Sequence, residues 1–271
     1  MKPLSPDELD QAARQLFRGR AHPPRLISHL PPVCRPQLVA DAMAIQSRLH
    51  ELLTEAGRGE VVGTKIGCTT PVMQAYLGMA HPCAGGIFES TVLQHSGEVS
   101  FDRFLHVGVE CEIAVRIGKS IQPRDHSYGR EEIAHHVEAV FAAIEIVDDR
   151  YVDFANREPD WRTWVADDFF GAGLVLGPPV TDWQTLDLAS VHGEMRINGT
   201  SVGDGVGRDI INGHPLEALV WLANSESARQ REIPAGWLIA LGSVVQTQWV
   251  SRGDLVSVHF ADLGEAAVRF A

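Results

Sequence analysis

The chain has 271 residues, 45% of them hydrophobic and 21% charged, which is the composition of a globular protein and excludes a disordered one. Its formal net charge of −12 argues against nucleic acid or an anionic membrane surface as a partner. An anionic substrate would therefore need a local positive centre, which a metal ion supplies. The four cysteines show no CxxC spacing and are expected to be free thiols, as in a cytoplasmic protein. No apolar run typical of a signal peptide or a membrane span occurs, so we expect a soluble protein.

Two helices are expected within the first sixty residues. Ser5 as N-cap, Pro6 in the first helical position and Glu8 in a capping box predict the start of the first helix, which ends at Gly19. The second helix is expected over residues 37–53, because apolar residues recur there at helical spacing: Leu38, Ala42, Ile45, Leu49 and Leu52. These helices form a predicted N-terminal region, residues 1–60, ahead of a catalytic domain over residues 61–271.

A strand is predicted over residues 61–67, and it contains an unusually placed lysine. Lys65 lies between β-branched or apolar neighbours, so it either extends to water or is buried for a reason, and the sequence leaves both open. A short helix capped by Thr70 is expected to run to Leu77. Residues 81–86 are expected to form a mobile loop close to whatever Lys65 faces.

The strand predicted over residues 107–117 is central, because it carries two acids in an apolar setting. Side chains alternate faces along a strand, so Glu110 and Glu112 share one face and Cys111 points to the other. Two buried, unneutralised carboxylates would cost many kcal/mol unless they took up protons or bound a cation. A hard divalent metal resolves this conflict, whereas an edge strand with one solvent-exposed face would avoid it.

A third acid follows in the next strand. A helix is predicted over residues 130–140 and continues into an apolar strand over residues 141–151, which Glu145 interrupts. Such an acid would complete an oxygen-ligand set for Mg²⁺, which usually keeps waters that a substrate can replace. His135 and His136 are expected to face solvent or the core and not to bind the metal.

The rest of the chain is mainly β. Asp167 and Asp168 precede a glycine-bearing strand, and Asn198-Gly199 predicts a tight hairpin turn. A helix is expected over residues 216–223, followed by closing strands over residues 238–249, 255–260 and 266–270. Helices first and strands afterwards predict an α+β fold with a β-rich catalytic body.

The order and spacing of these motifs resemble the 2-keto-4-pentenoate hydratase family, which is related to the 4-oxalocrotonate decarboxylases within the fumarylacetoacetate hydrolase superfamily. The likeness runs from about residue 62 to residue 270. It is carried by Lys65-Ile66-Gly67, Glu110-Cys111-Glu112, Glu145-Ile146-Val147-Asp148 with Arg150-Tyr151, Ala166-Asp167-Asp168, Gly213-His214-Pro215-Leu216 with Val220-Trp221-Leu222-Ala223, and Gly253-Asp254.

The resemblance implies a helical N-terminal region joined to a β-rich roll, assembled as a homo-oligomer. It implies that Glu110, Glu112 and Glu145 bind Mg²⁺ or Mn²⁺ and that Lys65 lies in the active site. The substrate would be a small 2-oxo or 2-hydroxydienoic acid. Lys65 would orient the substrate carboxylate, or transfer a proton if burial near the cation lowers its pKa. Asp167 or Asp168, with Asp167 preferred, would position water or relay protons.

The expected reaction is hydration of a 2-hydroxypenta-2,4-dienoate-like acid to a 4-hydroxy-2-oxo acid in aromatic catabolism. Two segments depart from the family pattern, Pro82 to Gly85 and Leu241 to Thr247, and both are expected to contact the substrate. Decarboxylation of a 2-oxo-hexenedioate and hydrolysis of an acylpyruvate therefore stay open as alternatives. A non-catalytic scaffold subunit is a further alternative, which the complete acidic triad with Lys65 disfavours.

Overall fold

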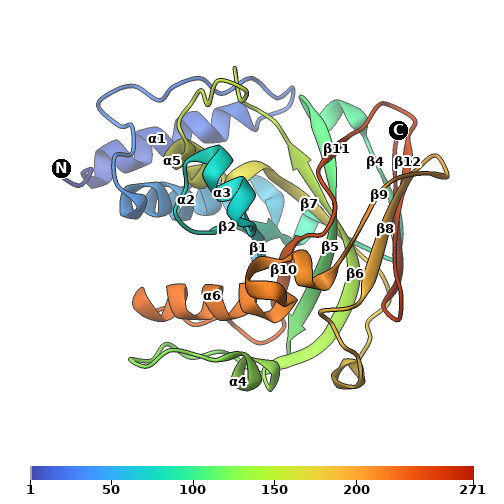
Figure 1. Ribbon diagram of the computed structural model, residues 1–271. Helices are drawn as coiled ribbons and strands as arrows, with labels where there is room; N and C mark the ends of the chain where they lie inside the picture. Colours follow the sequence, from blue (N-terminus) through green and yellow to red (C-terminus); the bar gives the residue numbers. More distant parts are fainter. Residues whose placement is uncertain (1) are drawn as a thin grey trace.

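The computed structural model describes residues 2–271 and places helices beside two sheets (Figure 1). The helices are α1 (Pro6–Gly19), α2 (Val39–Leu53), α3 (Pro71–Leu77), α4 (Arg130–Ala134), α5 (Trp161–Ala166) and α6 (Pro215–Ala228). No helix in this range is long and apolar enough to cross a membrane.

Within residues 2–271 the strands form an eight-stranded sheet and a five-stranded sheet. The first has the order β2-β1-β10-β5-β6-β7-β3, with β11 paired to β5, and the second has the order β4-β13-β12-β8-β9. The strands are β1 (Val61–Gly67), β2 (Cys83–Phe88), β3 (Val92–Gln94), β4 (Ser96–Val99), β5 (Val107–Ile117), β6 (Val137–Asp148), β7 (Gly171–Leu176), β8 (His192–Ile197), β9 (Thr200–Val206), β10 (Leu238–Ser243), β11 (Gln248–Trp249), β12 (Leu255–Phe260) and β13 (Gly264–Phe270). The α+β prediction is confirmed.

The N-terminal helices form as their sequence patterns predict. The Ser5 side chain accepts from the Glu8 N–H and the Glu8 carboxylate accepts from the Ser5 N–H, so both halves of the capping box are present. The apolar face of α1 packs against that of α2, which begins at Val39 and ends at the predicted residue. The apolar cluster beneath them also includes Trp164 of α5, and the predicted domain boundary at residue 60 stays a prediction.

Strand β5 has the predicted bounds and lies inside the sheet. It pairs with β6 along its length, and with β10 and β11 on its other side, which rules out the edge-strand alternative. One face, with Val109, Cys111 and Ile113, is buried in a core shared with the five-stranded sheet. The opposite face carries the acids.

The helix predicted over residues 130–140 is wrong beyond Ala134. Strand β6 begins at Val137, which pairs with Ile117, and continues through residues 138–140. Val137 and Val140 fit either a helical or a strand pattern, and pairing with β5 decides for the strand.

The mobile loop predicted over residues 81–86 is also wrong, because Cys83 to Gly86 belong to β2 and pair with β1. Gly85 and Gly86 lack side chains because neighbouring groups pack closely against this strand, and not because the segment is a loop. A Cβ on Gly86 would lie 2.6 Å from the His50 ring, and one on Gly85 would collide with the backbone of Asp168.

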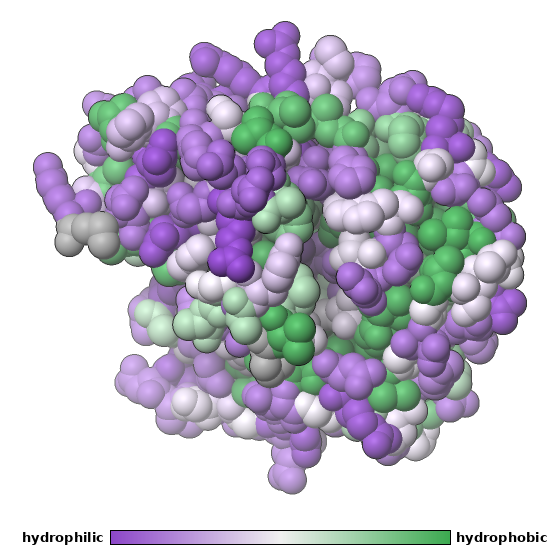
Figure 2. Space-filling model, turned by 45° about the horizontal axis from the view of Figure 1, so that its top comes forward, coloured by the Kyte–Doolittle hydropathy of each residue, from purple (hydrophilic) through white to green (hydrophobic). Residues whose placement is uncertain are grey.

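Later elements follow the predictions in part. The strand predicted over residues 255–260 is confirmed as β12, whereas the one predicted over residues 238–249 divides into β10 and β11, and the one predicted over residues 266–270 begins at Gly264 as β13. Asn198 and Gly199 adopt φ values of 51° and 82°, as the predicted tight hairpin turn between β8 and β9 requires. Helix α6 is longer than expected and ends at Ala228. Figure 2 shows hydrophilic side chains over much of one face, interrupted by apolar patches.

Candidate functional site

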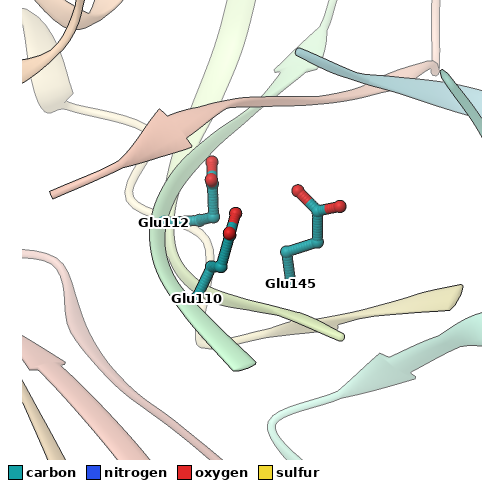
Figure 3. A group of neighbouring side chains, drawn as sticks. All are labelled: Glu110, Glu112 and Glu145. Carbon is teal, nitrogen blue, oxygen red and sulfur yellow. The ribbon is translucent and has the colours of Figure 1, made fainter. Parts of the chain in front are cut away.

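Three glutamates converge on the face of the sheet opposite the shared core (Figure 3). Glu110 and Glu112 share this face because they lie two residues apart on β5, and the β5–β6 register puts Glu145 opposite Glu110. One carboxylate oxygen from each residue lies within 4.8 Å of the others. Glu112 and Glu145 are buried, and Glu110 is partly exposed to solvent.

When all three carboxylates are ionised, they carry more negative charge than their surroundings compensate. Burial raises the pKa of Glu112 well above its ordinary value, and repulsion from Glu145 and Glu110 raises it further, against an opposing hydrogen bond from the Gly242 N–H. Burial also raises the pKa of Glu145 to about 7, although Lys65 opposes the rise. An all-oxygen donor set with excess negative charge fits a hard divalent cation.

Lys65 is buried, which resolves the alternatives that the sequence left open. Its Nζ lies 2.8 Å from Glu145 Oε1, and the side chain is 3% exposed. Burial alone would lower the pKa of Lys65, but the charges of Glu145 and Glu110 outweigh it and raise the pKa. The ammonium therefore stays protonated at neutral pH, which suits orienting an anion better than giving up a proton.

A strained turn lies against Lys65. Asp168, Phe169 and Phe170 have φ values of 57°, 45° and 67°, in the left-handed region that costs non-glycine residues energy. The turn sets the Phe169 ring with its centroid 5.1 Å from Lys65 Nζ, and a Cβ on Gly67 would lie 2.5 Å from this ring. The strained turn therefore holds the face of the Phe169 ring beside the Lys65 ammonium.

Asp168 fixes this turn through ion pairs. His50 Nε2 lies 2.5 Å from its Oδ1, Arg20 lies 3.0 Å from its Oδ2, and the Gly86 N–H donates to Oδ1. Burial alone would raise the pKa of Asp168, but the charges of His50 and Arg20 and the hydrogen bonds lower it well below its ordinary value.

Asp167 is similarly enclosed. Its Oδ1 accepts from Arg20 Nε at 2.7 Å, and its Oδ2 accepts from Arg150 Nε at 3.0 Å and from the Tyr151 hydroxyl at 3.2 Å. Thus the structure brings Lys65 to the glutamates, whereas Asp167 and Asp168 lie in an adjoining ion-pair network. Their predicted part in water or proton transfer stays a prediction.

Sequence reasoning missed several residues that support the site. The Thr247 hydroxyl donates to Glu110 Oε1, and the Gly242 N–H donates to Glu112 Oε2 at 2.6 Å. Both lie in the segment 241–247, which the sequence marks only as a departure from the family pattern. The sequence around His50 and Phe169 does not indicate their roles, because the residues that they contact, Asp168 and Lys65, are distant in the chain.

A family model and several characterised relatives match this chain in sequence. Residues 83–271 match the family model described as Fumarylacetoacetate (FAA) hydrolase C-terminal. The 2-hydroxyhexa-2,4-dienoate hydratase of Comamonas testosteroni is 32% identical, over 86% of each chain. The 4-oxalocrotonate decarboxylase of Pseudomonas putida is 29% identical, over 85% of each chain.

One solved structure shows the same fold over the whole chain. The 4-oxalocrotonate decarboxylase from Pseudomonas putida G7, complexed with magnesium and adipate, superposes with a TM-score of 0.90. The alignment covers 100% of both chains at 24% sequence identity, so it bears on the fold.

Proposed function

The chain belongs to the fumarylacetoacetate hydrolase family, and on that premise we propose that it is a divalent-metal-dependent hydratase. It adds water to a 2-hydroxypenta-2,4-dienoate-like acid, the enol of 2-keto-4-pentenoate, and forms a 4-hydroxy-2-oxo acid. This role belongs to the catabolism of aromatic compounds. The observation that carries the proposal is the cluster of Glu110, Glu112 and Glu145 beside the buried Lys65.

Glu110, Glu112 and Glu145 are the proposed ligands of Mg²⁺ or Mn²⁺. Support comes from their all-oxygen donor set and from the raised pKa values of Glu112 and Glu145. Within residues 2–271, Lys65 is also the one cationic side chain that forms an ion pair with them. A cation bound there would act as a Lewis acid and stabilise negative charge at the 2-oxygen of a keto acid.

Lys65 is proposed to bind and orient the substrate carboxylate. Its ammonium is protonated and held on one side by Glu145, and Nζ has further donor capacity that can reach an anion. The Phe169 ring limits the positions that the side chain can adopt. A fixed ammonium of this kind orders the acid end of the substrate before its far end reacts.

In the proposed reaction the 2-hydroxydienoate loses its enol proton and gains one at its far end, C5. The resulting 2-oxo-3-enoate accepts water, with the hydroxyl at C4 and the proton at C3. Asp167 and Asp168 are the candidates for positioning this water or relaying protons. Either role requires one of their ion pairs, with Arg20, Arg150 or His50, to open.

Decarboxylation of a 2-oxo-hexenedioate is the second candidate, because 4-oxalocrotonate decarboxylases occur among the relatives at the same level of identity as the hydratases. Loss of CO₂ from such an acid also develops an enolate at the 2-oxygen, so the same carboxylates and Lys65 would serve it.

The test is turnover by chelator-treated protein to which Mg²⁺ or Mn²⁺ is returned. Loss of dienoate ultraviolet absorbance without release of CO₂ is the expected result. Release of CO₂ would establish decarboxylation instead, and activity only in the presence of a second protein would establish a scaffold role. Absence of metal-dependent turnover with every 2-oxo and 2-hydroxydienoic acid tried would overturn the proposal.

We propose a cytoplasmic homo-oligomer. Two observations support it: the four cysteines are free, and several large apolar side chains are exposed, which an interface between copies would bury. These side chains are Leu26, Val33, Val72, Met73 and Tyr76.

A further inference from the structure

A strongly basic pocket adjoins the glutamate cluster. Its lining includes five cationic side chains and two acidic ones: Arg20, Arg58, Lys65, Arg103 and Arg150, with Glu145 and Asp148. The formal net charge of the whole chain is −12, so this local excess of positive charge runs against the average composition. Such a reversal of sign concentrates anions at one place on the molecule.

Three of the five cations have acidic partners, and two do not. Arg20 and Arg150 pair with Asp167, and Lys65 pairs with Glu145. Among residues 2–271, Arg58 and Arg103 form no ion pair and no side-chain hydrogen bond. Their guanidinium donors are therefore available to a ligand.

Arg58 is half-buried, so its charge has lost part of its hydration and has no acidic partner in return. It lies in the turn after α2 (Thr54–Arg58), whereas Arg103 is exposed in a short turn before β5 (Phe101–Arg103). Burial lowers the pKa of Arg58, and repulsion from Arg103, Arg20 and Arg150 lowers it further. An anion between these groups would relieve the repulsion and replace the water that Arg58 has lost.

The pocket has room for part of a small acid and is continuous with the proposed catalytic site. Its volume is about 60 Å³, and one wall consists of the small residues Gly171, Ala172 and Gly173. Lys65 and Glu145 line the pocket, and Glu145 also belongs to the glutamate cluster. A single extended substrate can therefore have one end at the cluster and the other among the arginines.

We propose that Arg58 and Arg103 bind a second carboxylate of the substrate, at the end opposite the 2-oxo acid. The preferred substrate is then a dicarboxylic member of the 2-hydroxydienoic or 2-oxo acids. Guanidinium groups suit this task because their paired donors match the two oxygens of a carboxylate. This inference rests on the proposed function, since it assumes that the keto-acid end lies at the glutamates.

The experiment compares two unreactive probes of equal length, 2-oxohexanedioate and 2-oxohexanoate, by calorimetry in the presence of Mg²⁺. The wild-type protein is expected to bind the dioate at least ten-fold more tightly than the monoacid. In Arg58→Gln and Arg103→Gln this ratio is expected to fall towards one. Arg130→Gln is the matched control, because Arg130 is exposed on α4 and pairs with Glu217 away from the pocket.

The possible outcomes distinguish failure of the pocket assignment from failure of the proposed function. An unchanged ratio in both arginine variants, with circular dichroism showing native folds, would overturn the proposal. Simultaneous binding of inorganic phosphate and the monoacid, lost in Arg58→Gln, would show a site for a separate anion and also overturn it. Metal-dependent turnover of dienoates by the wild type is measured in parallel. If turnover occurs and the ratio is unchanged, only the pocket assignment fails; if no dienoate reacts, the proposed function fails.

Discussion

Glu110, Glu112 and Glu145 differ in how the chain compensates their charge. Glu110 receives the Thr247 hydroxyl, Glu112 receives the Gly242 N–H, and Glu145 faces the Lys65 ammonium. These contacts orient the three carboxylates, but they include only one full positive charge. At the scale of residues, the site is a set of oriented carboxylate oxygens that suits a cation.

Thr247 is expected to act through Glu110 by orienting its carboxylate. The substitution Thr247→Val removes the hydroxyl while nearly preserving the volume, so Mg²⁺ affinity should fall about ten-fold. Thr247→Ser restores a hydroxyl and should recover most of the affinity. Calorimetric titration with Mg²⁺ measures both, and equal affinity in Thr247→Val and the wild type would show that the contact does not matter.

Asp168 is expected to contribute to stability in a pH-dependent way. Its pKa is lower in the folded protein than in the unfolded chain, so the unfolded chain takes up a proton first as the pH falls. The stabilisation is therefore complete well above pH 3.8 and is lost progressively below it. Asp168→Asn should cost about 3 kcal/mol at pH 7, the scale of a broken buried ion pair.

Urea unfolding of the wild type and Asp168→Asn at several pH values tests this expectation. The difference between their free energies of unfolding should shrink as the pH falls below 3.8. Asp125→Asn, at an exposed position, serves as the control and should show little difference at any pH. A difference that stays constant down to pH 2 would contradict the role given to Asp168.

At the scale of elements, the β5–β6 pairing assembles the site. Period-two alternation predicted that Glu110 and Glu112 share a face, and the strand bounds of β5 were predicted correctly. The sequence could not give the register that sets Glu145 opposite Glu110, because register depends on long-range pairing. Nor could it reveal the left-handed turn at residues 168–170, whose conformation depends on ion pairs with α1 and α2 segments far away in the chain.

The glycines of β2 show why one local prediction failed. Adjacent glycines indicated mobility, yet Gly85 and Gly86 lie where the backbone of Asp168 and the His50 ring approach the strand. Gly86→Ala should therefore destabilise the protein by about 2 kcal/mol through overpacking. Gly129→Ala is the control, because nothing lies within 4 Å of a Cβ there. Chemical denaturation measures the free energy of unfolding of both variants. Equal values would show that no group packs closely against Gly86 and would favour a loop at residues 81–86.

At the scale of the whole molecule, charge is unevenly distributed. The chain is acidic overall, yet the basic pocket and the glutamate cluster lie side by side and share Glu145. Composition predicted only that an anionic substrate would need a positive centre. It could not predict that arginines from separate segments supply one, since Arg20, Arg58, Arg103 and Arg150 are distant in sequence.

Metal binding is expected to stabilise the whole fold, because the unfolded chain does not hold the three carboxylates together. At a free Mg²⁺ concentration one hundred times the dissociation constant, the gain is about 2.7 kcal/mol. Thermal unfolding in chelator and in Mg²⁺ measures this gain. An unchanged unfolding temperature at saturating Mg²⁺ would mean that the cluster binds no ion.

The most direct measurement is metal-dependent turnover of a 2-hydroxydienoic acid by Glu110→Gln and Glu145→Gln beside the wild type. Each substitution removes one carboxylate and keeps its shape, so both variants should fold normally by circular dichroism. We expect Mg²⁺ to activate the wild type and to leave both variants without turnover, and Glu138→Gln, an exposed change on β6, to behave as the wild type. Undiminished turnover in Glu110→Gln and Glu145→Gln would contradict a metal centre at these glutamates.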